Sequence, residues 1–323
     1  LLPIDIEKAI TIKAFLNDNN QKIWLKTEVP QLTFSEQELR GMEITLESTP
    51  NKSIVKGGGT LENQDGIKVT ANMTANADNG QLTLGASWNS SPNKLFDGQF
   101  QTKLQFAYTD DNQLSVFIDS DSSSTTINHA DWKLHPFHVH IAPKHITIKD
   151  FRFEHNANEF VSIDGTVANT PSDTLQVKLN DLELNYLLSL VKLEGISFGG
   201  KLSGYINAAD LYTKTPYLDG DIYAKDFTFC DGYMGDTHAR AHWNQDSARL
   251  EFLADVQENS RHTAHIDGLV DIADNELWLD IDADSLNAAF LNSMLSSFMS
   301  DIKGHASGHI IIGGKMDAID LNG

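Results

Sequence analysis

Apolar residues recur at every second position through most of this chain, and this period constrains the fold more than any other feature. In the segment QLTLGASW, Leu82, Leu84 and Trp88 share one face of an extended strand, while polar and small residues fill the other. The segment FQTKLQFAY repeats the pattern with Leu104 and Phe106. A period of two predicts half-buried β-strands.

The same alternation returns in the second half of the chain, in TLQVKLN and ELWLDIDAD. The apolar positions there are Leu175, Val177, Leu179, Leu277, Leu279 and Ile281. Turn-forming residues separate the strands at 77–81, 109–113, 169–173 and 273–276. We count roughly fifteen to twenty strands, at the regular spacing typical of all-β proteins.

Only two stretches have helical spacing, 180–195 and 284–304, so the expected class is all-β with two short helices. These stretches also expose an internal repeat with a period of about 100 residues. Landmarks recur in order in the two copies: Gly165 with Gly268, Leu184 with Leu286, Gly200 with Gly304, and Gly204 with Gly308. A fainter echo relates Trp88 to Trp243.

Repeats of this kind predict one elongated, repetitive antiparallel sheet over residues 1–323, built from modules 1–130, 131–247 and a truncated 248–323. The chain begins without methionine and stops in mid-pattern, so we expect it to be a piece of a longer protein. No window approaches 18 consecutive apolar residues.

Composition narrows the classes of partner. Forty per cent hydrophobic and 21% charged residues exclude global disorder, and a net charge of −21 disfavours nucleic acid and anionic lipid surfaces. The single cysteine, Cys230, permits no intrachain disulfide and no cysteine-rich zinc site.

The order of motifs from about residue 130 onward resembles a known family. A G-x-x-S-G strand at 200–204 is followed by PYLDGDI at 216–222, by F-x-F and GYMGD at 227–236, and by an alternating strand that ends in Trp-Asn. This pattern is similar to the repeats of TamB-type translocation and assembly module proteins, in the AsmA-like group. Before about residue 80 the resemblance is weaker.

The resemblance implies a periplasmic segment of a long protein of Gram-negative bacteria, anchored in the inner membrane by an N-terminal helix. It also implies a sheet curled into a taco-like trough with an apolar lining, and an outer-membrane barrel insertase (TamA- or BamA-like) as the partner of the full-length protein. Family members are implicated in phospholipid transport to the outer membrane and in outer-membrane protein assembly. The family brings no catalytic residues and no cofactor, so we expect no enzyme.

A sheet with one apolar face must cover that face with a second sheet, with itself or with lipid, and two short helices are too few to cover it. An open trough would shelter phospholipid acyl chains. Its predicted lining is Leu82, Leu84, Trp88, Leu104, Phe106, Val139, Ile141, Leu175, Val177, Leu179, Trp243, Leu277, Leu279 and Ile281. The alternative is a closed β structural or adhesive module with a side-chain-filled core.

Four histidines crowd the segment HPFHVHIAPKH, at His135, His138, His140 and His145. On a strand, His138 and His140 share the outward face opposite Val139, which leaves two convergent ligands where a zinc site needs three or four. We therefore predict solvated outer-face histidines and no metal. A structural metal at His135–His145 stays open as part of the closed-module alternative.

Three other motifs of metal, catalytic or phosphate sites are incomplete, because residues that each motif requires are missing. Asp280, Asp282 and Asp284 have calcium-loop spacing without the turn glycine or the final glutamate. Ser189 and Lys192 lack the accompanying motifs of serine acyl-enzymes. The segment KGGGT at 56–60 lacks the lysine and hydroxyl of a phosphate loop, and we interpret it as a turn entering the next strand.

Overall fold

The structure is a computed structural model, and it describes residues 4–5, 8–34, 37–62, 66–92, 95–108, 111–127, 129–168, 173–184, 198–212, 217–229, 232–271, 274–290, 292, 301–315 and 318–322. In these residues it contains 23 strands and a short 3-10 helix, η1 (Ala288–Phe290). The paired strands among the described residues run antiparallel. The predicted all-β class is confirmed, and the strands divide into two compact units, 1–156 and 157–323.

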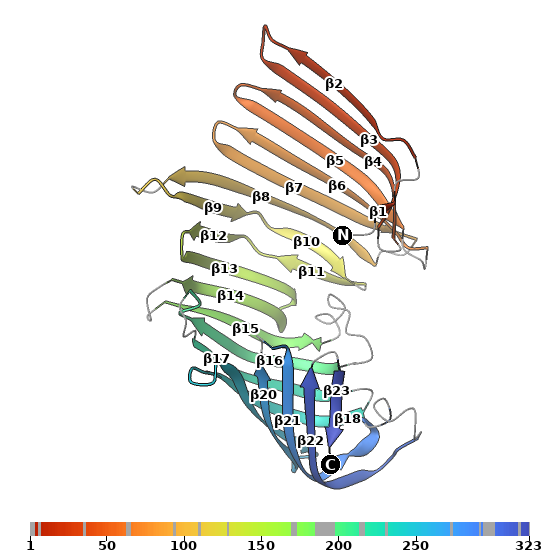
Figure 1. Cartoon of the computed structure of the whole chain (residues 1–323), viewed down its shortest axis with the longest axis vertical. Helices are drawn as coiled ribbons and strands as arrows, with labels where there is room; N and C mark the ends of the chain where they lie inside the picture. The colour runs from red at the N-terminus through yellow and green to blue at the C-terminus, as the bar shows by residue number, and fades with distance from the viewer. Residues whose placement is uncertain are drawn as a thin grey trace. The chain divides into compact units, whose positions relative to one another are not determined.

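Unit 1 (1–156) is a meander of long strands (Figure 1). Its strands are β1 (Ile4–Asp5), β2 (Thr11–Asn17), β3 (Lys22–Phe34), β4 (Gln37–Thr49), β5 (Lys52–Glu62), β6 (Lys68–Asp78), β7 (Gln81–Ser91), β8 (Phe96–Tyr108), β9 (Leu114–Ser120), β10 (Ser123–Ile127), β11 (Ala130–Leu134), β12 (Phe137–Ala142) and β13 (His145–Asn156). From β2 to β9, each strand pairs with the next along the chain.

Beyond β8 the ladder in unit 1 splits and rejoins. The two halves of β8 pair separately with β9 and β10, which lead to β12 and β11, and β13 then spans both of these strands. The break between β11 and β12 falls at His135 and Pro136. The His135 amide donates to the Arg152 carbonyl at 2.9 Å, so one backbone contact bridges the interruption.

Unit 2 (157–323) is also a meander, in which every strand pairs with its chain neighbour. Its strands are β14 (Glu159–Val167), β15 (Thr174–Glu183), β16 (Phe198–Ala209), β17 (Tyr217–Phe229), β18 (Gly232–Asn244), β19 (Arg249–Glu258), β20 (Arg261–Asp271), β21 (Glu276–Asn287), β22 (His305–Lys315) and β23 (Ala318–Asn322). Strand β18 also contacts β21 and η1, although β19 and β20 lie between β18 and β21 in the ladder. The sheet of unit 2 therefore curls over its own face.

The two helix predictions have mixed outcomes. Residues 180–183 belong to β15 and residues 284–287 to β21, so the predicted helices do not begin there. Extended backbone prevails because these residues continue ladders with β16 and β22. Leu184 and Asn292 are helical and η1 lies within the second stretch, while 301–304 are not helical. The remainders, 185–195 together with 291 and 293–300, lie outside the described residues.

The internal repeat is visible in unit 2 as matched distortions of two hairpins. β15 and β21 each carry a bulge with a positive-φ residue, Asp181 and Ser285, and each bulge is followed by a leucine that is 2% exposed, Leu182 and Leu286. The structural counterpart of Leu286 is therefore Leu182, not Leu184 as the sequence comparison suggested. The later glycine landmarks agree as well, because Gly200, Gly204, Gly304 and Gly308 all have positive φ. The earlier pair differs, since Gly165 has positive φ and Gly268 does not.

The predicted turn at KGGGT is wrong, since residues 56–60 lie inside β5. A Cβ atom at Gly58 would lie 2.5 Å from Asn72 Oδ1 and 3.0 Å from the Ala71 carbonyl oxygen on β6. Glycine here allows close approach of the neighbouring strand, a role that a strand interior can demand as readily as a turn. By contrast, the turn predicted at 77–81 is present, with positive φ at Asn79 and Gly80.

Candidate functional site

The predicted lining residues of unit 1 lie together on one face of its sheet. Leu82 on β7 pairs with Leu104 on β8, and the row continues across Ile118 on β9 to Val139 on β12. The next row joins Phe106, Val116 and Ile141. Leu84 and Trp88 alternate with polar neighbours on β7, which places them on this same face.

This apolar face extends over strands that the sequence prediction left out. Leu16 on β2 pairs with Ile23 on β3, and Met73 on β6 pairs with Gly57 and Ala86. The signal was present, because TIKAFLN and VTANMTANA alternate weakly around small residues. Below, "the open face" means this face of unit 1, and its large exposed residues on β2–β9 and β12 are Ile12, Leu16, Ile23, Val55, Met73, Phe96, Phe106, Tyr108, Leu114 and Ile141.

The open face is accessible to solvent. Leu16 is 73% exposed, Met73 64% and Phe106 47%, values that belong to side chains with little packed above them. Beside Leu82 and Phe106, the β4–β5 and β6–β7 turns surround a hollow of about 360 Å³. Exposed apolar surface is a typical feature of interaction sites, which makes the open face the candidate binding surface of unit 1.

The predicted lining residues of unit 2 share a face as well. In the first hairpin Val177 pairs with Ile163 and Ile206, and Leu175 and Leu179 lie at alternate positions of the same strand. In the later strands Leu277 pairs with Val270 and Leu279 with Gly268, while Trp243 pairs with Leu250.

In unit 2, part of this face is buried: of the predicted lining residues there, Ile281 is buried and the other six are half-buried. Ile281 is 5% exposed and belongs to a core that also contains Val256 at 1% and Ala264 at 0%. Leu279 packs against the same core, and Met234 on β18 reaches it from the curled part of the sheet. Ile281, predicted to line an open trough, therefore lies in the buried core of unit 2.

Each of the four histidines of segment 135–145 has a different hydrogen-bond partner. His135 Nε2 lies 2.6 Å from Glu154 Oε1, and His138 Nδ1 lies 2.5 Å from Asp119 Oδ1. The His145 ring contacts the Thr147 hydroxyl at 3.0 Å. The four rings therefore do not converge on one point.

His140 departs from the solvated outer-face position predicted for it. Its ring is half-buried and stacks on Phe117, with centroids 4.3 Å apart and planes 3° apart. Its Nε2 also lies 2.7 Å from the hydroxyl oxygen of buried Ser115. The face assignment is correct, but an aromatic neighbour on β9 shields the ring, which the sequence of β12 alone does not reveal.

Histidine beside carboxylate is the prevailing motif of the outer faces. His238 Nε2 lies 2.9 Å from Asp221 Oδ1, His305 Nε2 lies 2.9 Å from Glu258 Oε2, and His309 Nε2 lies 2.5 Å from Asp280 Oδ1. His238 and His242 lie opposite the apolar face of β18. In unit 1, hydrogen bonds from Arg152 and then from His135 lower the pKa of Glu154.

The structure also gathers ligand-type side chains at points where sequence analysis proposed no metal site. Among the described residues, two groups bring three potential ligand atoms within 4.8 Å of one another, and both lie in unit 2. One contains Asp255, His262 and His265, and the other contains Asp280, Asp282 and His309. Neither includes His135, His138, His140 or His145, so the alternative of a metal in that segment gains no support.

The remaining candidates add no further site. Asp280, Asp282 and Asp284 lie along β21, as the strand interpretation predicts. Ser189, Lys192 and Cys230 lie outside the described residues.

Comparison with known proteins gives no match: no family model, no curated protein and no solved structure resembles the chain significantly. Among the described residues, no helix has both the length and the apolar character needed to cross a bilayer.

Proposed function

We propose that this chain is a non-enzymatic segment that shelters lipid acyl chains, and that the open face of unit 1 is the surface that holds them. The observation that carries the proposal is the exposure of that face. Leu16, Met73 and Phe106 are between 47% and 73% exposed on β2, β6 and β8, and the opposite sides of β6 and β8 are mainly polar, whereas that of β2 carries Phe15. Acyl chains laid on such a surface gain about 0.8 kcal/mol for each methylene group removed from water.

The net charge of the chain favours the acyl tails of a lipid, and not its headgroup, as the part that contacts the protein. The chain carries a net charge of −21, which repels an anionic membrane surface and disfavours adsorption through phosphate groups. The open face itself is built from Ile, Leu, Val, Met and aromatic residues, so the contact it offers is hydrophobic.

The resemblance to TamB-type proteins extends this proposal to a cellular role. On that basis the chain is a periplasmic segment of an inner-membrane-anchored protein that supports phospholipid transport to the outer membrane and outer-membrane protein assembly, with a barrel insertase as partner. The closed core of unit 2 favours the second candidate, a structural module, for that half of the chain.

Photo-crosslinking tests the proposal with neighbouring residues as matched controls. Crosslinkable residues at Met73 and Phe106 lie on the open face, while those at Asn72 and Gln105 lie on the opposite face of the same strands. With the whole chain in cells, or purified with phosphatidylethanolamine vesicles, we expect phospholipid adducts at Met73 and Phe106 only.

Two outcomes contradict the proposal. Equal labelling of all four positions means that the face does not select lipid. Protein adducts at Met73 and Phe106, without phospholipid, mean that the face binds a polypeptide and that unit 1 is an adhesive module.

A further inference from the structure

The group Asp255, His262 and His265 depends on a β-bulge. On a regular strand, residues three positions apart point to opposite faces. Between β19 and β20 the register shifts, because Val256 pairs with Ala264 while Gln257 pairs with His262. Thr263 is the extra residue, and its insertion turns His262 and His265 to the same face.

The bulge is fixed by burial. Thr263 is 3% exposed, and its hydroxyl donates to the Val256 carbonyl oxygen at 3.3 Å. The next residue, Ala264, is fully buried in the core of unit 2. The spacing of the two histidines is therefore held by packing beneath the sheet, not by the histidines themselves.

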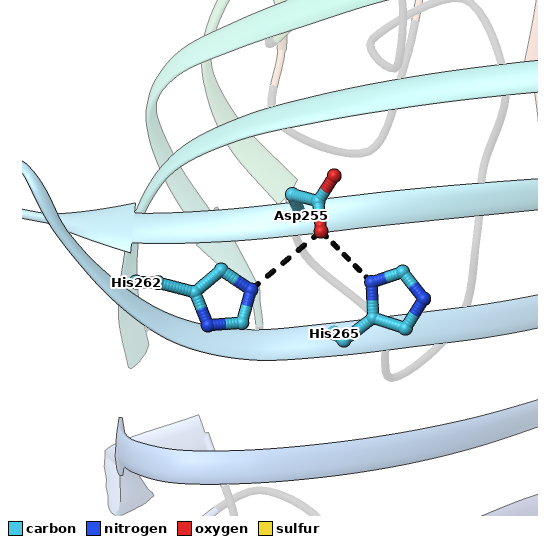
Figure 2. A group of neighbouring side chains, drawn as sticks. All are labelled: Asp255, His262 and His265. Atoms are coloured by element: carbon cyan, nitrogen blue, oxygen red, sulfur yellow. Dashed lines mark hydrogen bonds and ion pairs between the residues drawn. The ribbon is translucent and has the colours of Figure 1, made fainter.

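Asp255 lies between the two imidazole rings (Figure 2). Its Oδ1 atom is 2.8 Å from His265 Nδ1 and 3.5 Å from His262 Nε2. All three ligand atoms lie within 4.8 Å of one another, and the three side chains are between 33% and 51% exposed. In a tetrahedral zinc site with bonds near 2.0–2.1 Å, ligand atoms lie about 3.3 Å apart, so small rotations of the side chains would suffice.

A second carboxylate, that of Asp267, lies near the other ring nitrogen of His265. His265 Nε2, the ring nitrogen that faces away from Asp255, lies 3.6 Å from Asp267 Oδ2. Histidine ligands commonly donate this second N–H to a carboxylate, which fixes the tautomer and the ring orientation. On the other side, Arg240 Nη2 lies 3.9 Å from Asp255 Oδ2 and leaves Oδ1 to the histidines.

We propose that Asp255 Oδ1, His262 Nε2 and His265 Nδ1 bind one divalent transition-metal ion, with zinc as the best fit and water in the fourth position. Two imidazoles and one carboxylate suit zinc, copper or nickel, whereas calcium and magnesium require an all-oxygen shell. This inference is independent of the proposed function of the open face.

Two other histidines of unit 2, His242 and His309, provide controls for zinc binding. His242 Nε2 lies 3.4 Å from Glu251 Oε2 on β18 and β19, as a single pair with a similarly exposed imidazole. Asp280, Asp282 and His309 form the other three-ligand group, with one imidazole only. Affinity that depends on histidine number should therefore follow His262 and His265.

Zinc titration of the whole chain, prepared without a histidine tag, tests the proposal by calorimetry and by competition with a chromophoric chelator. We expect one tightly bound zinc per chain, with Co²⁺ giving the visible absorption of a tetrahedral site. His262→Ala and His265→Ala should each abolish that site, and Asp267→Asn should weaken it roughly 10–100-fold. His242→Ala and His309→Ala should leave it unchanged.

Circular dichroism of each variant establishes that folding is retained. Stoichiometric binding that survives His262→Ala and His265→Ala together, or that disappears in His309→Ala, would overturn the assignment. So would the absence of saturable zinc binding to the folded wild-type chain.

Discussion

Units 1 and 2 are built from the same alternating strands, yet their apolar faces differ in how far they are buried. Among the described residues, the buried hydrophobic side chains of unit 1 are Val29, Ala130 and Trp132. Unit 2 encloses a core around Val256 and Ala264. Equal alternation therefore does not imply equal burial.

The difference follows from irregularities in the ladders. In unit 1 a bulge interrupts the pairing of β4 with β5. In unit 2 the register shifts between β15 and β16, β16 and β17, β17 and β18, β19 and β20, and β21 and β22. Bulges bend strands and increase twist, so their accumulation lets the sheet of unit 2 curl over its apolar face.

The largest expected effect contrasts a charge in the closed core with the same charge on the open face. Val256→Asp places an unpaired carboxylate where the side chain is 1% exposed, and should lower the free energy of unfolding by about 3–5 kcal/mol. Met73→Asp, at a position 64% exposed, should change it by less than about 0.5 kcal/mol. Urea denaturation followed by circular dichroism measures both, and similar losses in the two variants would mean that the open face is also covered.

A smaller effect is expected from the glycines that allow curvature. Gly204 has φ +142°, and a Cβ atom there would lie 2.0 Å from the Asp221 carbonyl oxygen. Gly204→Ala should lower stability by about 1–3 kcal/mol through backbone strain and displacement of β17.

Gly57 in β5 is the matched control in unit 1, because a Cβ atom there meets ordinary contacts at 3.5 Å and φ is not positive. Gly57→Ala should leave the melting temperature nearly unchanged. If calorimetry shows equal shifts for the two variants, special backbone geometry does not distinguish unit 2.

The smallest expected effect concerns pH and Glu154 in unit 1. Hydrogen bonds from Arg152 and His135 lower the pKa of Glu154, so the stability that these bonds add is complete above the unfolded value of about 4.3. It is lost as the pH falls through the lower, folded value. Glu154→Gln should therefore flatten the decline in stability below about pH 4, measured by urea midpoints across pH. An unchanged decline would assign it to other carboxylates.

Sequence alone determined the features that depend on near neighbours. Period-two alternation predicted the strands and the face to which Leu104, Val139 and Leu279 belong, because side-chain direction on a strand alternates with each residue. The Asn79-Gly80 turn followed from residues that tolerate positive φ. The repeat could be recognised from sequence because the glycines at 200, 204, 304 and 308 all occupy positions with positive φ.

Tertiary structure decided which apolar face is covered and which polar residues meet. Curvature is the sum of small bends over many strands, so the burial of Ile281 and the exposure of Phe106 cannot be told apart from their own segments. The pairing of His262 with His265 depends on one inserted residue, Thr263, whose bulge is set by packing against β19. A bulge shifts the residues beyond it to the other face of the strand, so the alternation used for strand prediction no longer gives their direction. The sequence RHTAHID contains no local pattern that predicts this bulge.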